Sequence, residues 1–134
     1  MIKTKSDLIH AWCEKGRRDF ITARNALGKN EEIFPDIICF HAQQSAEKYL
    51  KAYLVFEDQD FPKTHALEDL VLLASVKDPE CRKLFDLASE LSPYAVEIRY
   101  PESTSPSVHD AEEAVQSADT IKTYVLGMIK LTEY

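Results

Sequence analysis

The sequence predicts an all-α protein, an up-and-down bundle of about five helices, four long and one short. Apolar residues recur with the period of an amphipathic helix over most of the 134 residues, and no segment alternates with the two-residue period of a strand. The three glycines are few for a turn-rich β fold. A single domain over residues 1–134 is expected, because this length is sufficient to bury a core of its own.

The first helix is expected over residues 6–27. Ser6 is a suitable N-cap, and Gly28 is a stop signal at the other end. Arg17, Arg18 and Arg24 lie off the apolar stripe or at its edge, which favours a solvated outer face for them.

The second helix, residues 35–56, begins at Pro35, a residue that suits the first helical position. Its apolar arc is wide enough to meet more than one neighbouring helix, so it is expected at the centre of the bundle. Gln43 falls inside this arc. A second arc is narrow and polar, and we call it the polar seam: His41, Gln44, Lys48 and Lys51.

Three further helices are predicted over residues 66–74, 79–91 and 110–131. Thr64 is expected to cap the first, and Asp78 followed by proline favours the start of the second. Ser107 and Asp110 resemble a capping box at the start of the last.

Composition and charge exclude several classes of function. The net charge of −7 disfavours a whole-surface affinity for nucleic acid or anionic membrane. No apolar run is long enough to span a bilayer, so a cytoplasmic protein is expected. Three widely spaced cysteines without a CxxC pair favour reduced, packed thiols. No cofactor and no metal site are expected, because the four histidines are scattered and lack ligand spacing.

Four polar features of the sequence are candidates for function: the polar seam, Lys63-Thr64-His65, Arg99-Tyr100-Pro101 and His109. Each also has a purely structural explanation. A histidine or glutamine inside a bundle helix is often a buried group that its neighbours satisfy, and lysines usually form a solvated face. The Thr64-His65 pair suits a helix start, and Arg99 could bridge a carboxylate.

Three of these motifs together resemble the HEPN domain family: Cys39-Phe-His-Ala-Gln-Gln-Ser-Ala-Glu-Lys-Tyr-Leu-Lys-Ala52, Phe61-Pro-Lys-Thr-His-Ala-Leu67 and Arg99-Tyr-Pro101. The resemblance covers nearly the whole chain and implies a helical bundle that is commonly dimeric. It also implies one of two activities. Some members bind nucleotides and are encoded beside a minimal nucleotidyltransferase; others are metal-independent endoribonucleases, often toxins, with an arginine followed shortly by a histidine.

The leading hypothesis is a module that binds a nucleotide or RNA phosphate and forms a homodimer. Its partner would be a minimal nucleotidyltransferase, in a toxin–antitoxin-like pair. Arg99 would bind an anionic group bidentately, Lys48 and Lys51 would add positive potential, and His41 and Gln44 would hold a base or ribose. The resemblance adds His65 and Tyr100 to this set.

Two alternatives stay open. In a metal-independent ribonuclease, His109 would be the general base and Arg99 would stabilise charge on the phosphate. Nine residues separate the two, so the family's short spacing is absent. In a purely protein–protein interaction module, the polar seam would serve only as a dimer interface.

Overall fold

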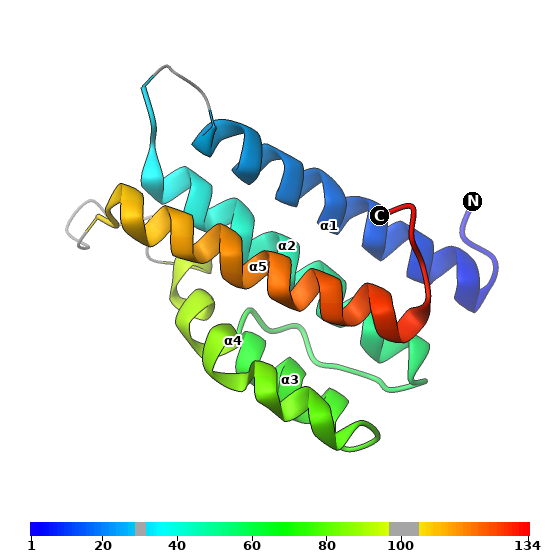
Figure 1. Ribbon diagram of the computed structural model, residues 1–134. Coiled ribbons are helices and arrows are strands. Elements are labelled where there is room, and N and C mark those ends of the chain that lie inside the picture. Colours follow the sequence, from blue (N-terminus) through cyan, green and yellow to red (C-terminus); the bar gives the residue numbers. More distant parts are fainter. Residues whose placement is uncertain (29–31, 97–104) are drawn as a thin grey trace.

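A computed structural model of the chain describes residues 1–28, 32–96 and 105–134, and over these residues all regular structure is helical (Figure 1). The prediction of an all-α fold is therefore confirmed. The elements in chain order are α1 (Lys5–Leu27), α2 (Pro35–Phe56), α3 (Leu67–Ser75), the 3-10 helix η1 (Pro79–Leu84), α4 (Phe85–Leu91), the 3-10 helix η2 (Ser92–Ala95) and α5 (Val108–Ile129).

Helix α2 lies at the centre, between α1 on one side and α5, α3 and α4 on the others (Figure 1). It runs antiparallel to α1 and in the same direction as α5. Lys5 near the start of α1, Phe56 at the end of α2 and Ile129 at the end of α5 accordingly meet around one pocket. The parallel arrangement arises because residues 57–66 lead the chain back along the bundle to α3 (Figure 1).

The broad apolar arc predicted for α2 is buried as expected. Tyr49, Leu50, Tyr53 and Leu54 are all almost completely removed from solvent. Helix α1 approaches this arc closely at Gly16, where a Cβ atom would lie 2.9 Å from the ring of Tyr49. A side chain at this position would therefore displace the ring.

The start of α1 corrects one prediction. The N-cap is Thr4, not Ser6, and the helix begins at Lys5. Thr4 Oγ1 accepts a hydrogen bond from the Asp7 amide at 3.0 Å, and Asp7 Oδ2 accepts one from the Thr4 amide at 3.3 Å. Thr4 is the N-cap because an acid, Asp7, follows three residues later and completes a capping box.

The start of α5 has the predicted capping box, formed by Ser107 and Asp110. The Asp110 amide donates to Ser107 Oγ at 3.0 Å, and the Ser107 amide donates to Asp110 Oδ2 at 2.8 Å. Hydrogen bonds to the Asp110 carboxyl from the backbone and the side chain of Ser107 lower its pKa.

The start of α3 is capped from elsewhere in the fold. Thr64 does not cap it, because its hydroxyl accepts from the amide of Ala66 at 3.0 Å, one residue before the helix. The first helical amide, that of Leu67, donates instead to Ser92 Oγ at 2.7 Å. Ser92 Oγ in turn donates to Glu68 Oε1 at 2.9 Å, so the α3 start is tied to η2.

The predicted helix over 79–91 is divided into η1 and α4, and Asp78 does not cap it through its side chain. The Asp78 carboxylate instead accepts from Tyr53 at 2.6 Å and from Tyr124 at 2.5 Å. These two bonds join α2 and α5 to the start of η1. We call Asp78, Tyr53 and Tyr124 the Asp78 clamp.

Cys13, Cys39 and Cys81 are buried free thiols, as predicted. Burial raises their pKa values, to about 12, about 11 and about 12 respectively, so they stay protonated at neutral pH.

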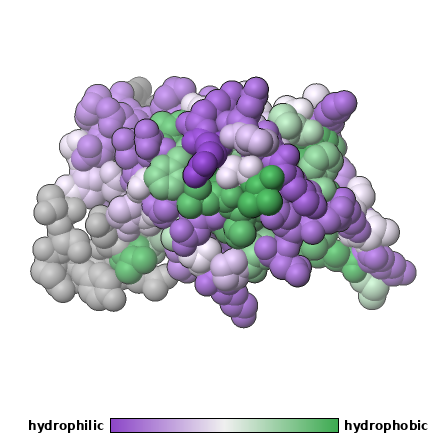
Figure 2. Space-filling view, turned by 90° about the horizontal axis from the view of Figure 1, so that it is seen from below, coloured by the Kyte–Doolittle hydropathy of each residue, from purple (hydrophilic) through white to green (hydrophobic). Residues whose placement is uncertain are grey.

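The face of the molecule on the α3 and α4 side carries an apolar patch flanked by hydrophilic side chains (Figure 2). Leu72 and Val76 are exposed apolar residues in and directly after α3, and Leu72 also lines a shallow pocket with Pro62 and Leu73. Among the described helices, none has the length and hydrophobicity of a membrane span.

Candidate functional site

The polar seam of α2 is organised around two acidic residues. The first is Asp19 on α1, whose carboxylate Oδ1 lies 2.8 Å from His41 Nδ1. Its other oxygen accepts from the ammonium of Lys48. We call Asp19, His41 and Lys48 the Asp19 cluster; it joins α1 to α2 across their interface.

The second acidic residue is Glu47 on α2, which is almost fully buried. Its Oε1 lies 2.8 Å from His65 Nδ1 and accepts from Gln43 Nε2 at 3.3 Å, while its Oε2 accepts from Lys51 Nζ at 3.0 Å. Gln43, fully buried, also donates to the carbonyl of His65 at 3.2 Å. We call Gln43, Glu47, Lys51 and His65 the Glu47 cluster. It ties the 57–66 segment to α2.

Hydrogen bonds decide the charge of Glu47. Burial by itself would raise the pKa of this carboxyl, but the bonds from His65, Lys51 and Gln43 outweigh burial and hold the pKa below its usual value. Glu47 is therefore a carboxylate at neutral pH and accepts hydrogen bonds only. The proton between Glu47 and His65 accordingly lies on Nδ1 of the imidazole.

Gln44 is bonded to the Glu47 cluster. Its amide nitrogen donates to Gln43 Oε1 at 2.6 Å, which completes the hydrogen bonding of the buried Gln43 amide. The sequence-based expectation that neighbouring groups satisfy Gln43 is met by Gln44, Glu47 and the His65 carbonyl. The side chain of Gln44 itself is only half-buried.

The imidazoles of His41 and His65 both keep solvent contact. The side chain of His65 is 56% exposed and that of His41 is 29% exposed, although each Nδ1 is bonded to a carboxylate. Among the described residues, nothing is bonded to Nε2 of either ring. A carboxylate on Nδ1 fixes the ring and its tautomer, so Nε2 accepts a proton when the ring is neutral and donates one when it is charged.

The two lysines of the seam are paired with acids. Lys48 is bonded to Asp19 and Lys51 to Glu47, so their charges are largely balanced. Lys51 is only 9% exposed, and the alternative that it belongs to a solvated face is wrong. Its ammonium lies 5.5 Å from the ring centroid of Trp12 and 5.7 Å from that of Phe61, which are cation–π distances.

The remaining predicted site residues do not join either cluster. Arg99 and Tyr100 lie outside the residues that the structure describes. His109 is exposed in the first turn of α5, where its Nε2 lies 3.0 Å from Glu113 Oε1 on the same helix. The structure thus brings together His41 with Lys48, and His65 with Lys51, while His109 is paired on α5.

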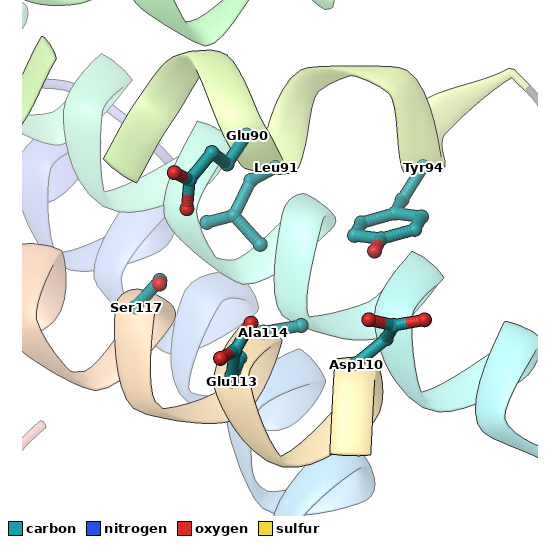
Figure 3. A pocket seen from close by; sticks show the side chains of 7 residues that line it. All are labelled: Glu90, Leu91, Tyr94, Asp110, Glu113, Ala114 and Ser117. Atoms are coloured by element: carbon teal, nitrogen blue, oxygen red, sulfur yellow. The ribbon is translucent and has the colours of Figure 1, made fainter. Parts of the chain in front are cut away.

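Glu113 also lines an acidic pocket of about 230 Å³ between α4, η2 and α5. Figure 3 shows Glu90 on α4 and Tyr94 on η2 opposite Asp110, Glu113 and Ser117 on α5. Three carboxylates in one small pocket repel an anion, so this pocket is unsuited to a phosphate group.

Sequence reasoning missed Asp19 and Glu47, the residues that organise the site. The i, i+4 spacing of Glu47 and Lys51 was a signal for one ion pair. Asp19 had no such signal, because it lies on another helix, 22 positions from His41 and 29 from Lys48.

The fold and the two clusters define an all-α protein with two carboxylate-bound imidazoles, His41 on the central helix α2 and His65 on the segment that follows it. The HEPN domain family matches residues 9–128, and this chain belongs to that family. No curated protein matches the sequence.

Two solved structures are similar over most of their length. The crystal structure of TT1696 from Thermus thermophilus is 28% identical with a TM-score of 0.70, over 92% of this chain and 98% of that one. The crystal structure of ST0689, an archaeal HEPN homologue, is 24% identical with a TM-score of 0.69, over 90% of this chain and 97% of that one, and this second likeness concerns the fold alone.

Proposed function

We propose that this HEPN domain is a cytoplasmic module that binds a nucleotide or an RNA segment through phosphate. It would act as a homodimer with a minimal nucleotidyltransferase, in a toxin–antitoxin-like pair. One observation supports the proposal most: His41 and His65 are each held through Nδ1 by a carboxylate at 2.8 Å and keep an unbonded Nε2 among the described residues.

Charge arithmetic makes this binding dependent on pH. With both imidazoles neutral, Asp19 and Glu47 balance Lys48 and Lys51, and the clusters carry no net charge. Protonation of the two imidazoles adds two positive charges and turns each Nε2 into a donor. Phosphate affinity is therefore expected to increase as the pH falls, because protonation supplies this charge and these donors.

Arg99 and Tyr100 belong to the proposed site as predictions. A guanidinium is suited to bind a phosphate bidentately, and lysine is a poor substitute because it lacks the paired donors. Arg99→Ala is expected to abolish ligand binding with little change in melting temperature, and Arg99→Lys is not expected to restore binding. A lower melting temperature with unchanged affinity would instead assign Arg99 a structural role.

Isothermal titration with ATP, GTP, UTP and a short RNA at pH 6 and pH 8 tests the phosphate site. Binding should be tighter at pH 6, and the double variant His41→Asn/His65→Asn should lose this dependence. His10→Asn is the matched control, because His10 is a half-buried histidine of α1 bonded to Tyr134 at 2.8 Å, remote from both clusters in its contacts. Absence of heat with every ligand up to millimolar concentration would remove the phosphate proposal.

The apolar patch of the α3 side supports self-association, because contiguous exposed apolar surface marks interaction sites. Leu72→Asp and Val76→Asp should convert a dimer to a monomer in light scattering after gel filtration. A wild-type protein that is monomeric at all concentrations would overturn the homodimer. Co-expression with a minimal nucleotidyltransferase encoded nearby, followed by pull-down, tests the second partner.

Metal-independent RNA cleavage is the enzymatic alternative. Its support is the exposed position of His109 at the start of α5. Cleavage of RNA in EDTA by the wild type, and not by His109→Ala, would replace the binding proposal with this one. Equal behaviour of the two proteins, without cleavage, excludes it.

A further inference from the structure

We infer that the open pocket beside Trp12 and Phe61 is a base-binding site selective for guanine, in a nucleotide or in single-stranded RNA. This inference rests on the proposed function and adds a base subsite to its phosphate site. The pocket has a volume of about 690 Å³, within the usual range for small-molecule sites. Its lining is Lys5, Leu8, Trp12, Val55, Asp58, Gln59, Asp60 and Phe61.

Two aromatic rings form one wall. Trp12 comes from α1 and Phe61 from the segment after α2, and their centroids lie 6.3 Å apart at an interplanar angle of 68°. Both side chains are only partly buried, so ring surface is left for a ligand. Unpaired bases bind proteins mainly by stacking on such rings.

The positive charge of Lys51 favours a neutral base over a cationic ligand in this pocket. Its ammonium lies over both rings but does not line the pocket; the Lys51 residue is almost fully buried and is bonded to Glu47 at 3.0 Å. A second cation on the open side would be repelled by Lys51. A neutral, electron-rich base is instead attracted to rings that a cation already polarises.

The polar lining favours guanine among the bases. Asp58 is paired with Lys5 at 2.9 Å, and the Gln59 amide donates to Glu57 at 3.0 Å and to the Leu73 carbonyl at 2.8 Å. Asp60 is exposed and has no hydrogen bond or ion pair with any described residue.

A carboxylate accepts two parallel N–H bonds. The Watson–Crick edge of guanine presents two adjacent N–H groups, on N1 and on the exocyclic nitrogen. The same edge of adenine, cytosine or uracil presents only one N–H donor, so none of them can place two donors side by side on Asp60.

The base pocket and the phosphate site share one buried ion pair. Glu47 holds His65 through Oε1 and Lys51 through Oε2, and Lys51 lies against Trp12 and Phe61. Phe61 and His65 also belong to the same 57–66 segment. One nucleotide ligand could therefore engage both sites through this segment.

Trp12 provides a direct test, because it is the single tryptophan of the chain. Its fluorescence would be titrated with guanosine, adenosine, cytidine and uridine, which lack phosphate, and separately with inorganic phosphate. Guanosine should quench the fluorescence at the lowest concentration. Asp60→Asn should weaken guanosine affinity about tenfold or more, as expected for loss of a charged bidentate acceptor.

Asp86→Asn is the matched control, because Asp86 is an exposed acid on α4 outside the pocket lining, and it should bind guanosine as the wild type does. Phe61→Leu keeps apolar bulk but removes the stacking ring and should abolish guanosine binding. Circular dichroism and the melting temperature of each variant show whether it folds.

The outcomes separate this inference from the proposed function. If titration with ATP gives heat but guanosine does not quench the fluorescence, the base pocket is overturned and phosphate binding stands. If guanosine quenches the fluorescence but phosphate has no effect, the base pocket stands and phosphate binding is overturned. Equal quenching by all nucleosides, or an unaltered Asp60→Asn, overturns guanine selectivity. Quenching by N-acetyl-arginine amide instead of guanosine would make this a pocket for an arginine side chain of a protein partner, and would also overturn the inference.

Discussion

Asp78 and Glu47 are two carboxylates that do similar structural work with different donors. Asp78 accepts from the hydroxyls of Tyr53 and Tyr124, at 2.6 and 2.5 Å. Glu47 accepts from Lys51 and Gln43 and is bonded to the imidazole of His65. Each carboxylate ties α2 to a distant part of the chain, but only Glu47 has a histidine partner.

The pKa values of Asp78 and Glu47 are shifted by the same two opposing effects, burial and hydrogen bonding. Burial alone would raise the pKa of the Asp78 carboxyl, but the bonds from Tyr124 and Tyr53 outweigh it and lower that pKa, as the donors of Glu47 do there. The tyrosines respond oppositely: burial and the adjacent carboxylate raise the pKa values of Tyr53 and Tyr124. The Asp78 clamp thus keeps one protonation state at physiological pH.

This difference shows that the type of donor decides whether the charge at a buried carboxylate is constant or can vary with pH. A tyrosine pair gives a clamp whose charge does not vary, whereas an exposed histidine on a buried acid gives a site that can gain a proton and bind an anion. The following predictions test the contrast between the Asp78 clamp and the Glu47 cluster.

Tyr53→Ala should have the largest effect, lowering the free energy of unfolding by about 3–5 kcal/mol. The change removes a fully buried aromatic side chain from α2 and also leaves Asp78 with one donor fewer. Urea denaturation monitored by circular dichroism measures it. A loss below about 0.5 kcal/mol, the range of surface substitutions, would mean that the clamp contributes nothing to the core.

Glu47→Gln should cost about 2–3 kcal/mol at pH 7, because it leaves Lys51 buried without its counterion. The value is below the roughly 3–5 kcal/mol of a fully buried broken pair, since Lys51 retains some solvent contact. The same denaturation assay applies. Glu47→Gln/Lys51→Met should recover part of the loss; a double variant less stable than Glu47→Gln would show that the pair is not the cause.

The stabilising effect of Glu47 should decrease in acid. Its folded-state pKa is lowered, so its contribution is present above the unfolded value, near 4.5, and is lost as the pH falls through the folded value. The difference in unfolding free energy between the wild type and Glu47→Gln should therefore shrink below about pH 4.5. A difference that grows in acid would contradict the sign of this shift.

Tyr53→Phe and Tyr124→Phe should each cost about 0.5–1.5 kcal/mol, the net value of one hydrogen bond. The cost should be equal at pH 6 and pH 8, because neither the clamp tyrosines nor Asp78 titrates between these values. Thermal denaturation at the two pH values checks this. A cost that changes across this range would indicate that the clamp is coupled to a histidine.

His65→Asn should have the smallest effect on stability, within about 0.5 kcal/mol, because the side chain is mostly exposed and Glu47 retains Lys51 and Gln43. It should nevertheless weaken phosphate binding at pH 6. Melting temperature and titration heat on one preparation separate the two effects. A large loss of stability with unchanged affinity would make His65 a structural residue like Asp78.

Helix positions were predictable because they depend on local patterns. The α2 bounds, Pro35–Phe56, follow from a proline start and a continuous apolar arc, and the α5 cap follows from Ser107 and Asp110 three residues apart. The same locality explains the errors. Thr4 and Ser6 are both acceptable caps by residue type, and only the partner Asp7 distinguishes them.

By itself, the sequence determined the all-α class, the central place of α2 and the line of polar residues along it, because each depends on residue type and helical period. Tertiary structure alone decided that Asp19 pairs with His41 and Lys48, that Ser92 caps α3, and that Asp78 binds two tyrosines instead of capping η1. The reason is physical: a buried polar group must find a partner, and which one it finds depends on which distant segments pack beside it.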